Sequence, residues 1–225
     1  MKREKRLYTV PGTGVTMGYI EYLPENYDEG KDYPLVLFLH GYGERGNGDE
    51  HEVEAVEVHG FPRYAHEGAE YPFVLIAPQC PSASIWPVLT ESLDLFLDHL
   101  LASYKVDPAR VCLTGLSMGG TEAWLWGCGR NERFACVVPV CGAVINWISF
   151  GLAETPVWAF HGTEDGCISC QESENMVNAI NRAGGHAKLT LYPGVGHDSW
   201  VNAYQDPALI EWITEQRLDH PRHII

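Results

Sequence analysis

Basic residues are scarce in this chain of 225 residues. It has 15 lysines and arginines against 30 aspartates and glutamates, which gives a formal net charge of −15 with neutral histidines. Nucleic acids and anionic membrane surfaces bind proteins through clustered positive charge. The charge balance therefore argues against both as main partners, although it predicts no fold by itself.

The sequence also lacks a long hydrophobic run. Its longest apolar blocks, such as residues 34–39, are much shorter than the roughly 18 to 20 residues that a membrane helix needs. No apolar segment with a small-residue cleavage site follows the basic residues 2–6, so they do not resemble a secretory signal. We therefore expect residues 1–7 to be a flexible tail on a cytoplasmic protein. A secreted protein is the alternative if the chain is one domain of a longer sequence.

Cysteine pairs are missing where a metal site would need them. Cys167 and Cys170 form a C-x-x-C motif, but neither a second such pair nor a His-x-x-x-His pair completes a zinc site. Seven cysteines are an odd number in a chain that is long enough to bury its own core. We therefore expect reduced and mostly buried thiols, no metal and no cofactor.

Alternating apolar patterns predict an α/β fold. Unbroken apolar runs at residues 35–39 and 73–77 are typical of strands covered on both faces. Apolar residues recur at helical spacing over residues 93–101. Further strands are expected at 16–22, 110–114, 135–140, 157–160 and 188–192, with helices between them. Because no repeat or linker interrupts this order, we expect a single domain over residues 1–225, built on a mostly parallel, doubly wound sheet with helices on both faces.

The strongest local motif follows the strand expected at residues 110–114. Gly115, Ser117 and Gly119 form the pattern G-x-S-x-G directly before a helix-like segment at 120–130. A nucleophilic serine on a sharp strand-to-helix turn needs small neighbours two positions away, because larger side chains would collide with the backbone. The alternative is a glycine-rich turn without chemistry, but the flanking strand and helix favour Ser117 as the nucleophile.

A serine hydroxyl needs a histidine base that is oriented by a carboxylate. Asp165 follows the strand expected at 157–160, and His197 follows the strand at 188–192. Parallel strands bring their carboxyl ends to one edge of a sheet, where both side chains can meet Ser117. The chain order Ser, Asp, His is the order found in α/β-hydrolases.

Other residues compete for these roles. Glu164 is a rival for Asp165, and we prefer the aspartate. His40 and His161 also follow strands, but each precedes a glycine, where a histidine more often braces a loop. Asp198 is interpreted as structural.

Acyl transfer also requires two backbone N–H donors for the developing oxyanion. The N–H of Met118, next to the nucleophile, is the first candidate. The second is expected in the glycine-flanked turn at residues 40–43, where we choose the Tyr42 N–H and keep Gly43 as the alternate.

Five blocks occur in an order and spacing similar to those of the α/β-hydrolase superfamily: LFLHGYGERG, APQCP, LTGLSMGG, FHGTEDG and GHDSW. More narrowly, the chain resembles small lidless serine esterases, including feruloyl and acetylxylan esterases, polyhydroxybutyrate-depolymerase-like esterases and predicted peptidases. The resemblance implies Ser117 as nucleophile, His197 as general base and acid, and Asp165 as orienting carboxylate. Residues 167–170 depart from the pattern, because relatives tend to have an apolar residue and a proline there.

Two segments bear on the substrate. Only residues 143–155 lie between the sixth and seventh core strands, so no large lid fits and interfacial lipase activity is disfavoured. The longest insertion, residues 44–70, is rich in glutamate and histidine. A solvated acidic helix is the preferred interpretation of this insertion, and a metal site is the alternative.

Three tryptophans fall in segments expected near the carboxyl edge of the sheet: Trp86, Trp147 and Trp200. Each either stacks on an aromatic acyl group or sugar ring, or seals a loop onto the core.

These features predict a serine carboxylesterase that hydrolyses short-chain or aromatic esters through an acyl-enzyme. By resemblance, the expected substrates are small-molecule esters or feruloyl and acetyl groups on plant polysaccharide. The alternatives are a prolyl-oligopeptidase-like peptidase without that family's propeller domain, and a non-catalytic binding protein on a hydrolase scaffold.

Overall fold

A computed structural model describes residues 1–27 and 32–218 of the chain. The strands are β1 (Lys2–Thr9), β2 (Thr16–Leu23), β3 (Tyr33–Leu39), β4 (Val74–Pro78), β5 (Val106–Leu116), β6 (Cys136–Val140), β7 (Trp158–Gly162) and β8 (Lys188–Tyr192). The helices are α1 (Gly60–His66), α2 (Thr90–Ser103), α3 (Met118–Gly129), α4 (Gln171–Arg182), α5 (Trp200–Ala203) and α6 (Pro207–Glu215). Short 3-10 segments are η1 (Tyr42–Glu44), η2 (Glu52–Glu57), η3 (Trp86–Val88), η4 (Asn131–Arg133) and η5 (Asn146–Leu152).

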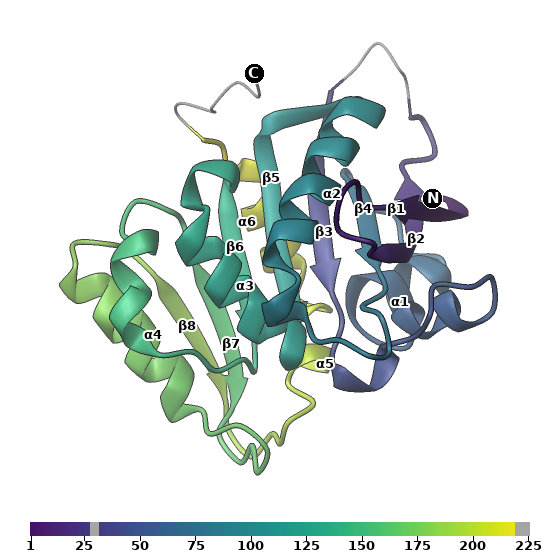
Figure 1. The fold of residues 1–225 in the computed structure, drawn as a ribbon. Coiled ribbons are helices and arrows are strands. Elements are labelled where there is room, and N and C mark those ends of the chain that lie inside the picture. The colour runs from purple at the N-terminus through teal and green to yellow at the C-terminus, as the bar shows by residue number, and fades with distance from the viewer. Residues whose placement is uncertain (28–31, 219–225) are drawn as a thin grey trace.

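The strands form one sheet with the order β1-β2-β4-β3-β5-β6-β7-β8. The β1–β2 and β2–β4 pairs are antiparallel, and the pairs from β4–β3 to β7–β8 are parallel. In Figure 1, α2, α3 and α4 lie in front of the sheet and α6 lies behind it. The predicted mostly parallel sheet with helices on both faces is confirmed.

Alternate residues along the central strands contribute to two hydrophobic cores. In β3, Leu35, Leu37 and Leu39 belong to the core that α2, α3 and α4 cover, whereas Val36 and Phe38 belong to the core under α1 and α6. All five side chains are completely buried. Because successive side chains of a strand point to opposite faces, a strand covered on both sides must be apolar throughout.

The predicted flexible tail at residues 1–7 is wrong. Lys2–Thr9 instead form the edge strand β1, which pairs along its whole length with β2. Arg3 of this strand binds the buried carboxylate of Glu57 at 2.7 Å through Nε. The strand is held by backbone pairing and by ion pairs with residues distant in sequence. Neither interaction requires apolar residues at a regular spacing, so the sequence pattern did not reveal the strand.

The insertion at residues 44–70 is not a solvated acidic helix. It folds into η2 and α1, which bury Val53, Val56 and Phe61 in the same core as α6. Its glutamates and histidines lie on a segment that packs against the sheet. The number of charged residues therefore led us to expect too little burial for this segment.

The carboxyl ends of the parallel strands share one edge of the sheet, at the bottom of Figure 1, where α5 also lies. The connection from β6 to β7 holds η5 as its only regular element, which agrees with the expectation that a large lid does not fit. No helix in the described ranges has both the length and the apolar character needed to cross a membrane.

Candidate active site

Ser117 occupies the sharp turn between β5 and α3. Its backbone angles, φ 53° and ψ −115°, lie in a region that non-glycine residues rarely adopt. A Cβ at Gly115 would lie 2.5 Å from the Gly119 carbonyl oxygen, and a Cβ at Gly119 would lie 2.0 Å from that of Leu39. Both contacts would be severe clashes, so the predicted need for glycine at the two positions is confirmed.

His197 and Asp165 reach Ser117 from the loops after β8 and β7. Ser117 Oγ lies 2.8 Å from His197 Nε2, and His197 Nδ1 lies 2.7 Å from Asp165 Oδ2. The carboxylate accepts a hydrogen bond from the Nδ1–H group, which leaves Nε2 free to accept a hydrogen bond from the serine hydroxyl. The Asp165 side chain is completely buried, whereas that of His197 is 22% exposed. The fold thus brings together the three residues that the sequence singled out.

Four donors surround the Asp165 carboxylate. Besides His197, the N–H groups of Cys167 and Ile168 donate to Oδ1 at 2.9 Å each, and His161 Nε2 lies 3.1 Å from Oδ2. Burial raises the pKa of Asp165, but the hydrogen bonds from His197 and the two backbone N–H groups outweigh it, so the net pKa is lowered. Asp165 is therefore ionised at neutral pH although it is buried.

His161, which we expected only to brace a loop, also contacts the acidic residue. Its ring is completely buried, with Nδ1 2.8 Å from Ser173 Oγ and Nε2 3.0 Å from the Ile168 carbonyl oxygen. Because Nε2 faces both this carbonyl and Asp165, Nε2 carries the ring proton and Nδ1 accepts the Ser173 hydroxyl. The signal that could have revealed this contact is a histidine four residues before the aspartate in HGTED.

Tyr42 and Met118 are the first residues of η1 and α3. The first N–H of a helix has no acceptor within that helix, so both groups can bind an anion. The two turns meet at Ser117, because a Cβ at Gly41 would lie only 3.7 Å from Ser117 Cβ. On the outer side, the Arg45 guanidinium lies 3.5 Å from the centre of the Tyr42 ring, and its Nε donates to the Tyr42 carbonyl.

Part of the sequence matches a known protein family. Residues 84–210, more than half of the chain and including the whole triad, match the dienelactone hydrolase family. The chain belongs to this family. Dienelactone hydrolases are part of the α/β-hydrolase superfamily, which agrees with the resemblance seen in the sequence blocks.

Several relatives of this dienelactone hydrolase family member carry esterase names, and one of Bacillus subtilis is named an uncharacterized peptidase. The chain is 28% identical over 165 residues to Probable feruloyl esterase C of Aspergillus terreus. This match covers 71% of this chain and 59% of that protein. It is 23% identical over 220 residues to feruloyl esterase D of Neurospora crassa, covering 90% of this chain and 72% of that one. A solved structure of a thermostable esterase matches with a TM-score of 0.82 and 29% identity, over 96% of this chain and 63% of that chain. The chain therefore spans less than two thirds of the Aspergillus relative.

The three tryptophans predicted at the substrate have different surroundings. Trp200 lies beside the triad, with its ring 5.4 Å from that of His197 and nearly perpendicular to it. Trp86 is completely buried and donates through Nε1 to the His40 carbonyl, so the prediction that it contacts substrate is wrong. Trp147 lies on η5 with 83% of its surface exposed, and its contact with substrate stays a prediction.

The residues considered as rivals of the triad take other positions. Glu164 and Asp198 are exposed, and it is Asp165 that binds His197. His40 is buried and accepts the Cys80 N–H through Nε2 at 2.9 Å. Burial lowers the pKa of His40 to about 4, so it is a neutral brace for the loop, as predicted.

One group of side chains in residues 1–27 and 32–218 could share a metal ion. The ligand atoms of Cys141, Asp165 and His197 lie within 4.8 Å of one another. Asp165 and His197 already hydrogen-bond each other, and burial raises the pKa of Cys141 to about 12. Metal binding needs a thiolate and a free imidazole nitrogen, so this geometry suits proton transfer better than coordination. All seven cysteines are free thiols, as expected.

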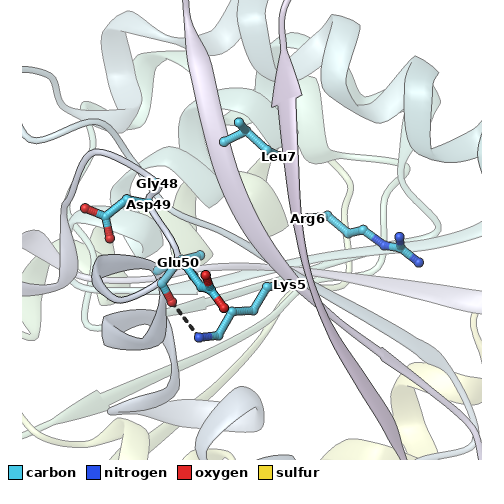
Figure 2. Close-up of a pocket in the computed structure, with 7 residues that line it drawn as sticks. Lys5, Arg6, Leu7, Gly48, Asp49 and Glu50 are labelled. Carbon is cyan, nitrogen blue, oxygen red and sulfur yellow. Dashed lines mark hydrogen bonds between the residues drawn. The ribbon is translucent and has the colours of Figure 1, made fainter.

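Two cavities lie outside the triad. One of about 320 Å³ separates β1 from the loop at residues 48–50, and Figure 2 shows Lys5 reaching across it to the Glu50 carbonyl oxygen. The other, of about 600 Å³, lies between the β1–β2 turn and the start of α2, with Thr13 and Thr90 in its wall. No triad residue lines either cavity, so neither defines the reaction site.

Proposed function

We propose that this protein is a serine carboxylesterase in which Ser117 is the nucleophile, His197 the general base and acid, and Asp165 the orienting carboxylate. The observation that carries this proposal is the continuous hydrogen-bond chain from Ser117 Oγ through both nitrogens of His197 to the buried Asp165. Membership of a hydrolase family and the names of its feruloyl esterase relatives support an ester as the bond that is cleaved.

In the acylation half-reaction, Ser117 Oγ attacks the ester carbonyl carbon while His197 Nε2 takes the hydroxyl proton. The carbonyl oxygen becomes an oxyanion, which the N–H groups of Tyr42 and Met118 stabilise. When the tetrahedral intermediate collapses, the bond to the alcohol oxygen breaks and His197 returns the proton to the leaving alcohol. The acyl group is then bound to Ser117 as an ester.

In the deacylation half-reaction, a water molecule gives a proton to His197 Nε2 and attacks the acyl carbon. A second oxyanion forms at the same two N–H groups. Its collapse breaks the bond to Ser117 Oγ, which recovers the proton from His197, and the carboxylic acid leaves. No cofactor is required, because His197 takes up one proton and releases one proton in each half-reaction.

Asp165 holds His197 in the tautomer that this cycle needs, and its charge stabilises the imidazolium formed at each attack. His161 is a positioning residue in this proposal. Its Nε2–H donates to Oδ2, the oxygen that His197 also binds, and the N–H groups of Cys167 and Ile168 hold Oδ1. The triad is thereby preorganised before substrate binds.

For the substrate, we propose a short-chain or aromatic acyl ester, including feruloyl or acetyl groups attached to plant polysaccharide. The names of the relatives support the acyl groups. The net charge of −15 argues against nucleic acid as a partner. The absence of a large β6–β7 insertion supports an open site that a polymer-attached ester can approach.

The test is hydrolysis of a panel of short-chain p-nitrophenyl esters and methyl ferulate by the native chain and by Ser117→Ala. We expect kcat/KM to fall about 10⁴-fold or more in the variant, because the nucleophile is lost while binding and the oxyanion donors remain. Ser169→Ala, which changes an exposed serine in the Asp165 loop, is the matched control and should retain activity. Equal activity of native chain and Ser117→Ala would refute the proposed nucleophile.

A proline-peptide chromogen belongs in the same panel. Cleavage of that peptide without cleavage of any ester would replace the esterase by a peptidase. Substrate binding without turnover by the folded native chain would favour a binding protein.

A further inference from the structure

Glu44 and His59 face each other on the rim of the triad. Glu44 ends η1, directly after the Tyr42 turn, and His59 is the residue before α1. Glu44 Oε1 lies 3.9 Å from His59 Nε2, and the two side chains are 12% and 29% exposed. This separation is too long for a direct hydrogen bond but matches the span that one oxygen atom can bridge.

This pair lies next to the nucleophile. A Cβ at Gly41 would lie 3.0 Å from Glu44 Oε2 and 3.7 Å from Ser117 Cβ, so Gly41 lies close to both side chains. Trp200 connects the other end, because its ring centre lies 5.0 Å from that of His59 and 5.4 Å from that of His197. Glu44 and His59 therefore lie on the same side of the site as His197.

Polar atoms here are incompletely paired. Glu44 Oε2 and Trp200 Nε1 are buried and have no hydrogen-bond partner in the described part of the chain. The neutral His40 has Nδ1 3.8 Å from Oε2, beyond hydrogen-bond distance, and that nitrogen already lies 2.6 Å from the Gly41 carbonyl oxygen. Unpaired buried polar atoms are costly, so a hydrogen bond donated to Oε1, the other oxygen of the same carboxylate, offsets part of this cost.

The groups available fit a hydroxyl ligand. A hydroxyl can donate one hydrogen bond and accept another. It can therefore donate to Glu44 Oε1 and accept from the Nε2–H group of His59 at the same time. The Trp200 ring offers a flat apolar surface beside these polar groups, which is the combination that a sugar ring requires. Because His197 protonates the leaving alcohol, a group held against Trp200 belongs to the alcohol part of the ester.

Resting on the proposed esterase function, we propose that Glu44 and His59, with Trp200 as the wall, form a subsite for a sugar hydroxyl in the alcohol part of the substrate. The subsite sets the preference between esters of sugars and esters of simple alcohols. It takes no part in forming or breaking bonds.

The test compares two esters that share one acyl group, that of the p-nitrophenyl or methyl ester which the native chain hydrolyses fastest. One is the methyl ester, and the other is the ester of the same acid with a hydroxyl of methyl xyloside. The native chain should favour the sugar ester in kcat/KM. Glu44→Gln and His59→Phe should each lower the ratio of sugar ester to methyl ester about tenfold, because each removes a hydrogen bond to a sugar hydroxyl. Glu67→Gln, an exposed glutamate next to α1, is the matched control and should leave the ratio unchanged.

The failures of the two proposals are distinguishable. If both esters are hydrolysed and the ratio is the same in all four proteins, the subsite is wrong and the esterase stands. If Glu44→Gln and His59→Phe slow both esters equally, these residues support the site without recognising sugar. Hydrolysis of neither ester by the folded native chain would overturn the esterase function and the subsite with it.

Discussion

Asp165 and Glu122 both have buried carboxylates, yet their charges differ. Asp165 has four donors around it, and its pKa is lowered despite burial. Glu122, in the second turn of α3, is completely buried and accepts one hydrogen bond, from Thr90 Oγ1 at 2.8 Å. Burial raises its pKa to about 8, so it is mostly protonated at neutral pH.

The difference shows that enough hydrogen-bond donors can outweigh the effect of burial and keep a carboxylate of this protein ionised. An ionised group can orient and stabilise an imidazolium, whereas a protonated one cannot. Burial also raises the pKa of Glu44, and the nearby His59 offsets this rise only in part.

The largest expected effect comes from Asp165→Asn. The amide would present a donor to Nδ1 and favour the wrong tautomer of His197, so kcat should fall about 10⁴-fold. Asp198→Asn, which changes the exposed neighbour of His197, is the matched control and should change kcat little. A loss of less than tenfold for Asp165→Asn would transfer the orienting role to another carboxylate, with Glu164 the first to examine.

A smaller effect is expected on stability for Glu122→Gln. The folded state holds the Glu122 proton up to about pH 8, whereas the unfolded chain releases it near pH 4.5. Because the folded state binds more protons in this window, Glu122 lowers the free energy of unfolding as pH rises from 4.5 to 8. The variant should therefore equal the native chain near pH 4 and exceed it by a few kcal/mol near pH 8.

Urea unfolding at several pH values measures this difference. Glu91→Gln, in the exposed first turn of α2, is the control and should track the native chain at each pH. A difference between Glu122→Gln and the native chain that is constant with pH would show that Glu122 is already ionised in the fold.

The smallest expected effect is on catalysis through His161. His161→Met removes the donor to Asp165 and should lower kcat about tenfold with little change in KM, the scale of one hydrogen bond to a charged group. His161→Gln has nearly the same shape as the methionine variant but keeps an N–H donor, so it should recover most of the activity. Equal losses in both variants would reduce His161 to a packing role.

Much of the fold was predictable because its signals are local. The strand at residues 188–192 has the predicted bounds, and the G-x-S-x-G turn needs its glycines for the steric reason inferred from sequence. The triad followed from one general property, that parallel strands end at the same edge of a sheet. These predictions needed periodicity, motif spacing and chain order alone.

What escaped prediction depends on contacts between distant segments. The basic residues of β1 have no apolar pattern and are held by carboxylates such as Glu57, far along the chain. Trp86 lies near the expected edge, but its side chain turns inward to the His40 carbonyl, and spacing carries no information on that orientation. The partners of His161 and the incomplete pairing of Glu44 likewise become visible only when loops are placed together.

The most direct test of the central claim is to trap the nucleophile with diethyl p-nitrophenyl phosphate and locate the adduct by mass spectrometry. We expect one diethylphosphoryl group per chain, on Ser117, with none in Ser117→Ala and much slower labelling in Asp165→Asn. An adduct on another residue, or continued ester hydrolysis by a chain that carries no adduct after exposure to the reagent, would contradict it.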